Sequence, residues 1–78
     1  MTGSEQPNSY DLAVGRLVQS AWQRAGMTQS QLERAAELQP TTISRAERGE
    51  TELGVYELAR VAGELNVGPA DLIPPIES

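Results

Sequence analysis

Two short helical patterns follow each other closely between residues 28 and 49, TQSQLERAAELQPTTISRAERG. The first begins at Thr28, and Gln31 three residues later completes the spacing of a capping box. The second begins near Pro40, because proline is favoured in the first turn of a helix, and Gly49 is suited to end it. Helices of roughly two to three turns are unstable in isolation. This stretch is therefore predicted to be part of a larger helical fold that buries one face of each helix.

Apolar residues recur at helical spacing in the rest of the chain as well. A first stripe ends before Gly26, a fourth helix is predicted at about residues 54–65, and Pro69 opens a short fifth helix. No segment shows the convincing two-residue alternation of a β-strand. The chain is predicted to be all-α, a compact five-helix bundle in a single domain over residues 9–76, after a disordered tail at residues 1–8.

The composition removes several classes of function. The 78 residues include no histidine and no cysteine, which excludes a Cys/His zinc site and a histidine-activated nucleophile. No pair of acidic residues has a spacing that demands catalysis or metal binding, so we expect no enzyme, no cofactor and no metal. Apolar runs are too short to span a membrane, and the N-terminus lacks signal-peptide features. We expect a cytoplasmic protein.

The net charge of −5 speaks against unspecific binding to nucleic acids, because such binding depends on cations that neutralise phosphates. The charge is unevenly distributed, however. In residues 1–49 five arginines balance five acidic residues, whereas residues 50–78 hold one arginine and six acidic residues. The excess acid therefore lies entirely in the C-terminal part, and a local basic surface remains compatible with the first part.

Two short helices joined by a tight turn inside a helical bundle form the helix-turn-helix arrangement. In this arrangement the second helix fits the major groove of DNA, which is about 12 Å wide, while the first crosses the backbone. The same geometry also occurs in bundles that do not bind DNA. The arrangement alone therefore indicates DNA binding without establishing it.

The chain resembles the lambda-repressor-like helix-turn-helix domains of the Cro/phage-repressor (XRE) class over about residues 12–73. The resemblance rests on the order and spacing of three segments: GMTQSQL at 26–32, ISRAERG at 43–49 and LARVAGELNV at 58–67. It implies a sequence-specific, DNA-binding transcriptional regulator. A small repressor or an antitoxin-like autoregulator is the form that we expect.

The resemblance assigns base reading to four residues of a recognition helix at about residues 40–48, namely Pro40, Thr41, Thr42 and Arg45. It assigns contacts with the sugar-phosphate backbone to Thr28, Gln29 and Arg48. Helical spacing agrees independently. With Ile43 and Ala46 inward, it places the following residues on the outward face: Thr41, Ser44, Arg45 and Arg48. A bidentate contact of Arg45 with guanine would supply about 1–3 kcal/mol of discrimination. The alternative interpretation of Arg45 is a solvated surface arginine or one with an intrahelical partner. The alternative for Arg48 is pairing with Glu52 or stabilisation of the helix C-terminus.

Several residues depart from the family pattern. Glu33 stands where the family has a small alanine, and is expected to turn outward to solvent or to widen the helix crossing. Glu37 stands where the turn has glycine, and a left-handed conformation would strain it by about 1–2 kcal/mol. Gln39, at the expected N-cap of the recognition helix, is a weaker cap than serine or threonine.

Trp22 replaces an arginine that, in relatives, pairs with the glutamate corresponding to Glu47. We expect a structural pair in which the indole N–H donates to Glu47, with Arg48 or Arg24 as alternative partners of that carboxylate. Trp22 itself is expected in the core. The loop after the recognition helix, Glu50-Thr51-Glu52, is acidic where relatives are often basic, which weakens contacts with phosphates.

Partners other than double-stranded DNA are also indicated. Three apolar residues near the C-terminus exceed what a small monomer needs: Leu72, Ile73 and Ile76. The resemblance implies that this end builds a homodimer interface, and the alternative is that these residues only cap the core of the monomer. A protein-interaction module is the alternative function. It would use the acidic face of residues 50–64 to bind a basic partner, with the helix-turn-helix as a scaffold.

Overall fold

The computed structural model describes residues 9–75. These residues form the helices α1 (Ser9–Arg24), α2 (Gln29–Ala35), α3 (Thr42–Glu47) and α4 (Val55–Leu65), followed by the 3-10 helix η2 (Pro69–Leu72). No strand occurs among them, which confirms the all-α class for this part of the chain. The expected tail at residues 1–8 lies outside the described residues. None of the described helices is both long enough and apolar enough to cross a membrane.

The fifth element differs from the sequence prediction. It is a single turn of 3-10 helix, so the expected bundle of five α-helices is wrong. The backbone N–H of Gly68 donates to Asp71 Oδ2 at 3.0 Å and closes the start of the turn. Ile73 is already extended, with φ −115° and ψ 121°, and two prolines follow it. Because proline has no N–H and disfavours a helical residue before it, the chain cannot continue as an α-helix.

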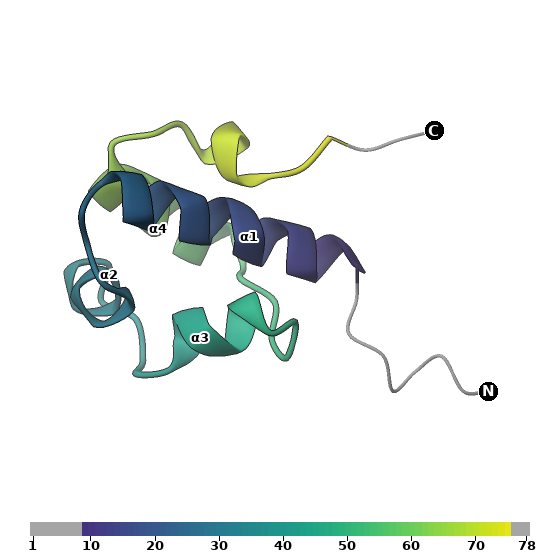
Figure 1. Cartoon of the computed structure of the whole chain (residues 1–78), viewed down its shortest axis with the longest axis horizontal. Helices are drawn as coiled ribbons and strands as arrows, with labels where there is room; N and C mark the ends of the chain where they lie inside the picture. Colours follow the sequence, from purple (N-terminus) through teal and green to yellow (C-terminus); the bar gives the residue numbers. More distant parts are fainter. Residues whose placement is uncertain (1–8, 76–78) are drawn as a thin grey trace.

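Helix α1 lies in the middle of the fold, with α3 on one side and η2 on the other, and α4 behind it (Figure 1). Each helix contributes its apolar stripe to one continuous core. The members of that core are Val14, Val18, Ala21, Leu32, Ala36, Ile43, Ala46, Leu53, Leu58, Val61, Ala62, Leu65 and Leu72. The core holds α3 in place, although α3 itself has only six residues.

Leu72 belongs to this core and not to a dimer surface. Only 1% of its surface is exposed, because η2 packs against both α1 and α4. Its assignment to a dimer interface is therefore wrong. Ile73, the next residue, is 42% exposed and remains available for contacts. Ile76 lies outside the described residues.

The helices α1 and α3 approach each other closely at Gly15. A Cβ atom at this position would lie 2.7 Å from Glu47 Cα and 2.8 Å from the Ala46 carbonyl oxygen. Such distances are shorter than carbon and oxygen atoms tolerate, so any larger side chain would push the two helices apart. Gly15 thus sets the distance between α1 and the last turn of α3.

The turn between α2 and α3 ends α2 in a Schellman motif. The N–H of Leu38 donates to the Glu33 carbonyl at 2.8 Å, and the N–H of Glu37 donates to the Arg34 carbonyl at 3.2 Å. Glu37 occupies the left-handed position of this motif with φ 60°. The expected left-handed glutamate is thus present, in a conformation that costs about 1–2 kcal/mol for a residue with a Cβ.

Candidate nucleic-acid interface

The recognition helix begins two residues later than the sequence predicts. Pro40 and Thr41 form a turn that precedes α3, in which the Thr42 N–H donates to the Gln39 carbonyl at 3.2 Å. Thr41 has φ 68° and ψ 0°, as at the third position of a type II turn, where proline is common at the second. Proline has the same φ in a turn and in a first helical turn, so the presence of Pro40 does not distinguish the two.

The left-handed conformation of Thr41 is unusual, since β-branched residues rarely have positive φ. Its carbonyl is nevertheless well bound: Ser44 Oγ donates to it at 3.1 Å and the Arg45 N–H at 2.9 Å. The Thr41 side chain forms no capping hydrogen bond and is exposed. The turn therefore presents Thr41 to solvent at the start of α3, next to the exposed face of that helix.

The N-terminus of α3 is capped by a residue of α2. The Ile43 N–H donates to Oε2 of Glu33 at 2.9 Å, and Glu33 is only 8% exposed. The expectation that Glu33 turns outward is therefore wrong. The first N–H groups of a helix have no acceptor within the helix. Here the carboxylate of Glu33 is the acceptor for one of them, the Ile43 N–H. Neither Gln39 nor Thr41 caps α3 with its side chain.

The other end of α3 is held by Glu47. Trp22 Nε1 donates to Glu47 Oε2 at 2.8 Å, and Gln29 Nε2 donates to Glu47 Oε1 at 2.7 Å. The carboxylate thus links α1, α2 and α3 through both of its oxygens. The indole is the partner that Glu47 has in this structure, in place of an arginine. The side chains that form these two hydrogen bonds, Trp22, Gln29 and Glu47, are all partly buried.

Gln29 brings the start of α2 next to the last turn of α3. Thr28 directly precedes it and caps α2, since Thr28 Oγ1 accepts from the Gln31 N–H at 3.1 Å. The Thr28 N–H in turn donates to Gln31 Oε1 at 2.9 Å, which completes the expected capping box. Gln29, with Thr28 directly before it, therefore lies at the last turn of α3, where it binds Glu47, the residue before Arg48.

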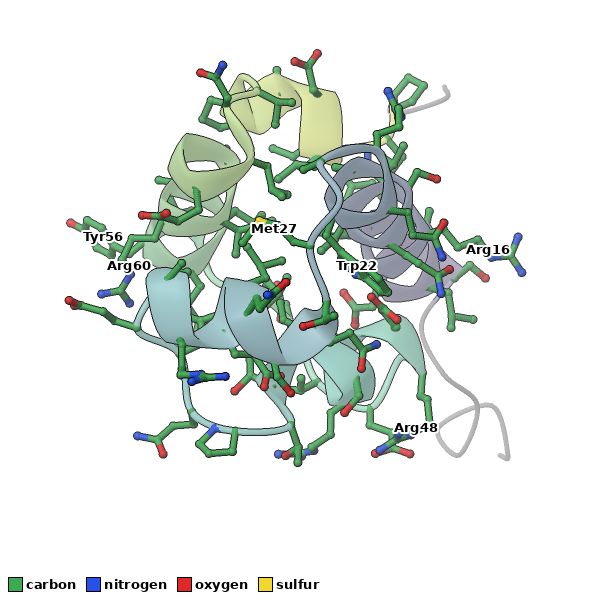
Figure 2. The ribbon with its side chains drawn as sticks, turned by 60° about the vertical axis from the view of Figure 1, so that its left-hand side comes forward. Arg16, Trp22, Met27, Arg48, Tyr56 and Arg60 are labelled. Carbon is green, nitrogen blue, oxygen red and sulfur yellow. The ribbon has the colours of Figure 1, made fainter. Side chains whose placement is uncertain are left out.

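Arg45 and Arg48 lie on the exposed side of α3, opposite Ile43 and Ala46, which are buried. Their side chains are 52% and 57% exposed. Figure 2 shows Arg48 at the outer edge of α3, away from Trp22 and Met27, which are partly buried against the core. Together with Thr41, these two arginines form an exposed ridge, which we call the α3 ridge.

Glu50 pairs with both arginines of the α3 ridge. Arg48 Nε donates to Glu50 Oε2 at 2.9 Å and Arg48 Nη2 to Oε1 at 3.2 Å, while Arg45 Nε lies 3.9 Å from Oε1. The hydrogen bond from Arg48, aided by both positive charges and opposed by some desolvation, holds the pKa of Glu50 below its usual range. The same hydrogen bond raises the pKa of Arg48.

Sequence reasoning missed Glu50 as the partner of these arginines. Residues two apart do not face each other on a helix, so the pair of positions 48 and 50 gave no signal. Gly49 lies between them with φ 76°, and the Glu50 N–H donates back to the Arg45 carbonyl at 2.9 Å. This reversal at Gly49, and not helical spacing, brings the Glu50 carboxylate beside the two arginines.

A family model described as helix-turn-helix matches residues 21–72. The clp gene regulator ClgR from Corynebacterium glutamicum has a similar structure, with TM-score 0.77 and 28% identity over 86% of this chain and 71% of that one. A second structure of ClgR from C. glutamicum gives a TM-score of 0.76 and 29% identity, over 83% of this chain and 84% of that one.

The restriction-modification controller protein C.AhdI from Aeromonas hydrophila shares the fold, with TM-score 0.75 and 22% identity over 81% of this chain and 97% of that one. A comparison with curated protein sequences gives no match. The family model covers the two helices of the motif and most of the core around them. This chain therefore belongs to the XRE-type helix-turn-helix family of DNA-binding transcription regulators.

Proposed function

We propose that this regulator is a repressor that occupies an operator with α3 in the major groove. One observation carries the proposal: α3 is anchored by Ile43 and Ala46, while Arg45 and Arg48 lie exposed on its other side. A helix fits the major groove, and arginine is the side chain that most often contacts guanine there. A short helix that is fixed at both ends, by Glu33 and Glu47, presents these arginines without first having to become ordered.

The proposed contacts divide along α3. Thr41, Thr42 and Arg45 read bases at its N-terminal and central part, and Pro40 contributes shape only, since it has no N–H donor. Arg48 and Thr28 contact phosphates at the other end. The amide of Gln29 binds Glu47 with one hydrogen and would reach a phosphate with its second hydrogen.

We further propose that the repressor binds DNA as a homodimer, through a surface that includes Ile73 of the expected interface but not Leu72. With Leu72 in the core, Ile73 is the described residue that remains from the expected interface. It lines a cleft of about 270 Å³ together with Tyr10 and Val55, which are 41% and 81% exposed. A two-fold dimer would place two recognition helices about one DNA turn, roughly 34–36 Å, apart.

The alternative function, binding of a basic protein partner by residues 50–64, receives less support. Two of the four glutamates in that segment are engaged within the chain. Glu50 pairs with Arg48, and Glu57 Oε1 accepts from the Gly54 N–H at 2.8 Å. DNA binding is therefore the function that the geometry supports best.

The test is retention of sheared genomic DNA on the immobilised protein at low salt, followed by sequencing. The wild-type chain is expected to enrich discrete fragments, and Arg45→Ala to lose most of that enrichment. Arg60→Ala is the matched control, because Arg60 lies exposed on α4, away from Arg48 (Figure 2). Equal enrichment by both variants would count against α3 as the recognition helix, and no retention at all would overturn DNA binding.

A further inference from the structure

Glu50 holds the two arginines of the α3 ridge in a geometry that also suits a phosphate. A guanidinium binds carboxylate and phosphate oxygens with the same fork of two N–H groups. Arg48 uses this fork on Glu50, with Nε at 2.9 Å and Nη2 at 3.2 Å from the two carboxylate oxygens. Arg45 Nε lies 3.9 Å from one of the same oxygens. The carboxylate thus occupies the place where a DNA phosphate would bind Arg48.

The position of Glu50 is set by the backbone and not only by the reach of its side chain. Gly49 has φ 76°, its N–H donates to the Ala46 carbonyl at 3.0 Å, and the Glu50 N–H donates to the Arg45 carbonyl at 2.9 Å. These two hydrogen bonds form the Schellman motif that ends α3. After the recognition helix ends, the chain therefore turns back over the last turn of that helix. This reversal carries the Glu50 carboxylate back towards the arginines.

The charge state of the pair favours its persistence at neutral pH. The hydrogen bond from Arg48 keeps the pKa of Glu50 low, so the carboxylate is ionised. Both side chains are about half exposed, which leaves the pair open to an incoming anion and to screening by salt. An ion pair of this kind can exchange partners at little cost.

We propose that Glu50 is an affinity-determining residue that competes with DNA phosphates for Arg48 and, more weakly, for Arg45. DNA of any sequence has to displace the carboxylate before Arg48 can contact a phosphate, and the displaced carboxylate then lies near the DNA backbone. Stable occupancy consequently requires the base contacts of an operator. This inference rests on the proposed DNA binding. It attributes to Glu50 the weak binding to DNA of unselected sequence that the acidic charge of the chain leads us to expect.

The experiment compares Glu50→Gln with Glu52→Gln. Both variants remove one negative charge from the same loop, but Glu50 alone of the two has an arginine within ion-pair distance in the part of the chain that the structure describes. Affinity for a short fluorescein-labelled duplex of unselected sequence is measured by anisotropy at several salt concentrations. Glu50→Gln is expected to bind on the order of ten-fold more tightly at about 0.1 M salt, with a slope of log K against log salt steeper by about 0.9 for each phosphate gained.

Glu52→Gln is expected to change the affinity by less than about two-fold with an unchanged slope, since it only relieves a screened repulsion. A double-mutant cycle tests whether the effect passes through Arg48. In the Arg48→Ala background, Glu50→Gln should lose most of its effect. Circular dichroism verifies that the exposed substitutions leave the fold intact.

The outcomes are distinguishable. Equal effects of Glu50→Gln and Glu52→Gln, or an effect of Glu50→Gln that survives in Arg48→Ala, would overturn the competition while leaving DNA binding in place. Absence of binding by every chain at the lowest salt would overturn the proposed function, and the inference with it. DNA binding by Glu50→Gln that is tighter and more salt-sensitive than that of the wild type, and that depends on Arg48, supports the inference.

Discussion

The carboxylate of Glu33 in α2 accepts a hydrogen bond from the backbone N–H of Ile43 in α3, with 2.9 Å between Oε2 and N. One helix of the helix-turn-helix thus caps the other. The turn before α3 supplies no side-chain cap of its own, and Thr41 within it is left-handed. The bond fixes the angle at which α3 leaves the turn, and therefore the direction in which the α3 ridge faces.

Replacement of Glu33 by Ala should lower the free energy of unfolding by about 2 kcal/mol, because it leaves the buried Ile43 N–H without an acceptor. Glu33→Gln keeps an oxygen acceptor and should cost clearly less. Urea denaturation followed by circular dichroism measures both. Glu64→Ala, an exposed change on α4, serves as the control and should stay within about 0.5 kcal/mol of wild type. Equal stability of Glu33→Ala and Glu64→Ala would contradict the capping role.

Trp22→Phe tests the link between α1 and α3. Phenylalanine retains most of the apolar contact but removes the N–H that binds Glu47, so the stability should fall by about 1–2 kcal/mol. In a Glu47→Ala background the same change should cost less, because the hydrogen bond is already absent. Thermal unfolding of the four chains provides the cycle. A coupling energy near zero would mean that the 2.8 Å contact does not stabilise the fold.

Glu37→Gly should stabilise the protein by about 1 kcal/mol, since glycine adopts the left-handed conformation without a Cβ penalty. Glu37→Ala is the matched control: it removes the same carboxylate but keeps the Cβ, and should bring no such gain. Chemical denaturation at neutral pH separates the two. If alanine stabilised as much as glycine, removal of the charge and not relief of strain would be the cause.

The titration of Glu50 tests its pairing in the free protein. Its pKa lies below the ordinary glutamate value because Arg48 donates to the ionised form. A lowered pKa in the folded state means that the pair favours folding at neutral pH, and that this contribution is lost as the pH falls through the lowered value. Carbon-detected NMR should show the lowered pKa of Glu50 in the wild-type chain and a rise of that pKa towards the ordinary glutamate value in Arg48→Ala. An identical titration in both chains would show that the pair does not form in solution.

The residues that local sequence could predict were those whose role depends on their immediate neighbours. Thr28 and Gln31 formed their capping box because both members lie in one turn. The left-handed Glu37 was expected from the resemblance, because the family has glycine at this position of the turn. Pro40 was misplaced because a proline has the same φ in a type II turn and in a first helical turn, so its conformation does not distinguish the two.

Residues whose role depends on a distant backbone group could not be predicted in this way. Glu33 was expected outside because glutamate is rarely buried without a partner, and that partner, the Ile43 N–H, becomes available only when the two helices pack. Leu72 was predicted at an interface because the C-terminal apolar residues exceed what a small monomer needs, and its packing against both α1 and α4 depends on the folded chain. Glu50 meets Arg48 only through the reversal at Gly49.

Selection of bound duplexes from a random DNA pool tests most directly whether the α3 ridge reads DNA sequence. The wild-type chain is expected to enrich a motif with two symmetric half-sites about one helical turn apart, and Arg45→Ala to relax the preference at one base pair in each half-site. A wild-type pool that remains as random as the input at low salt would contradict this expectation.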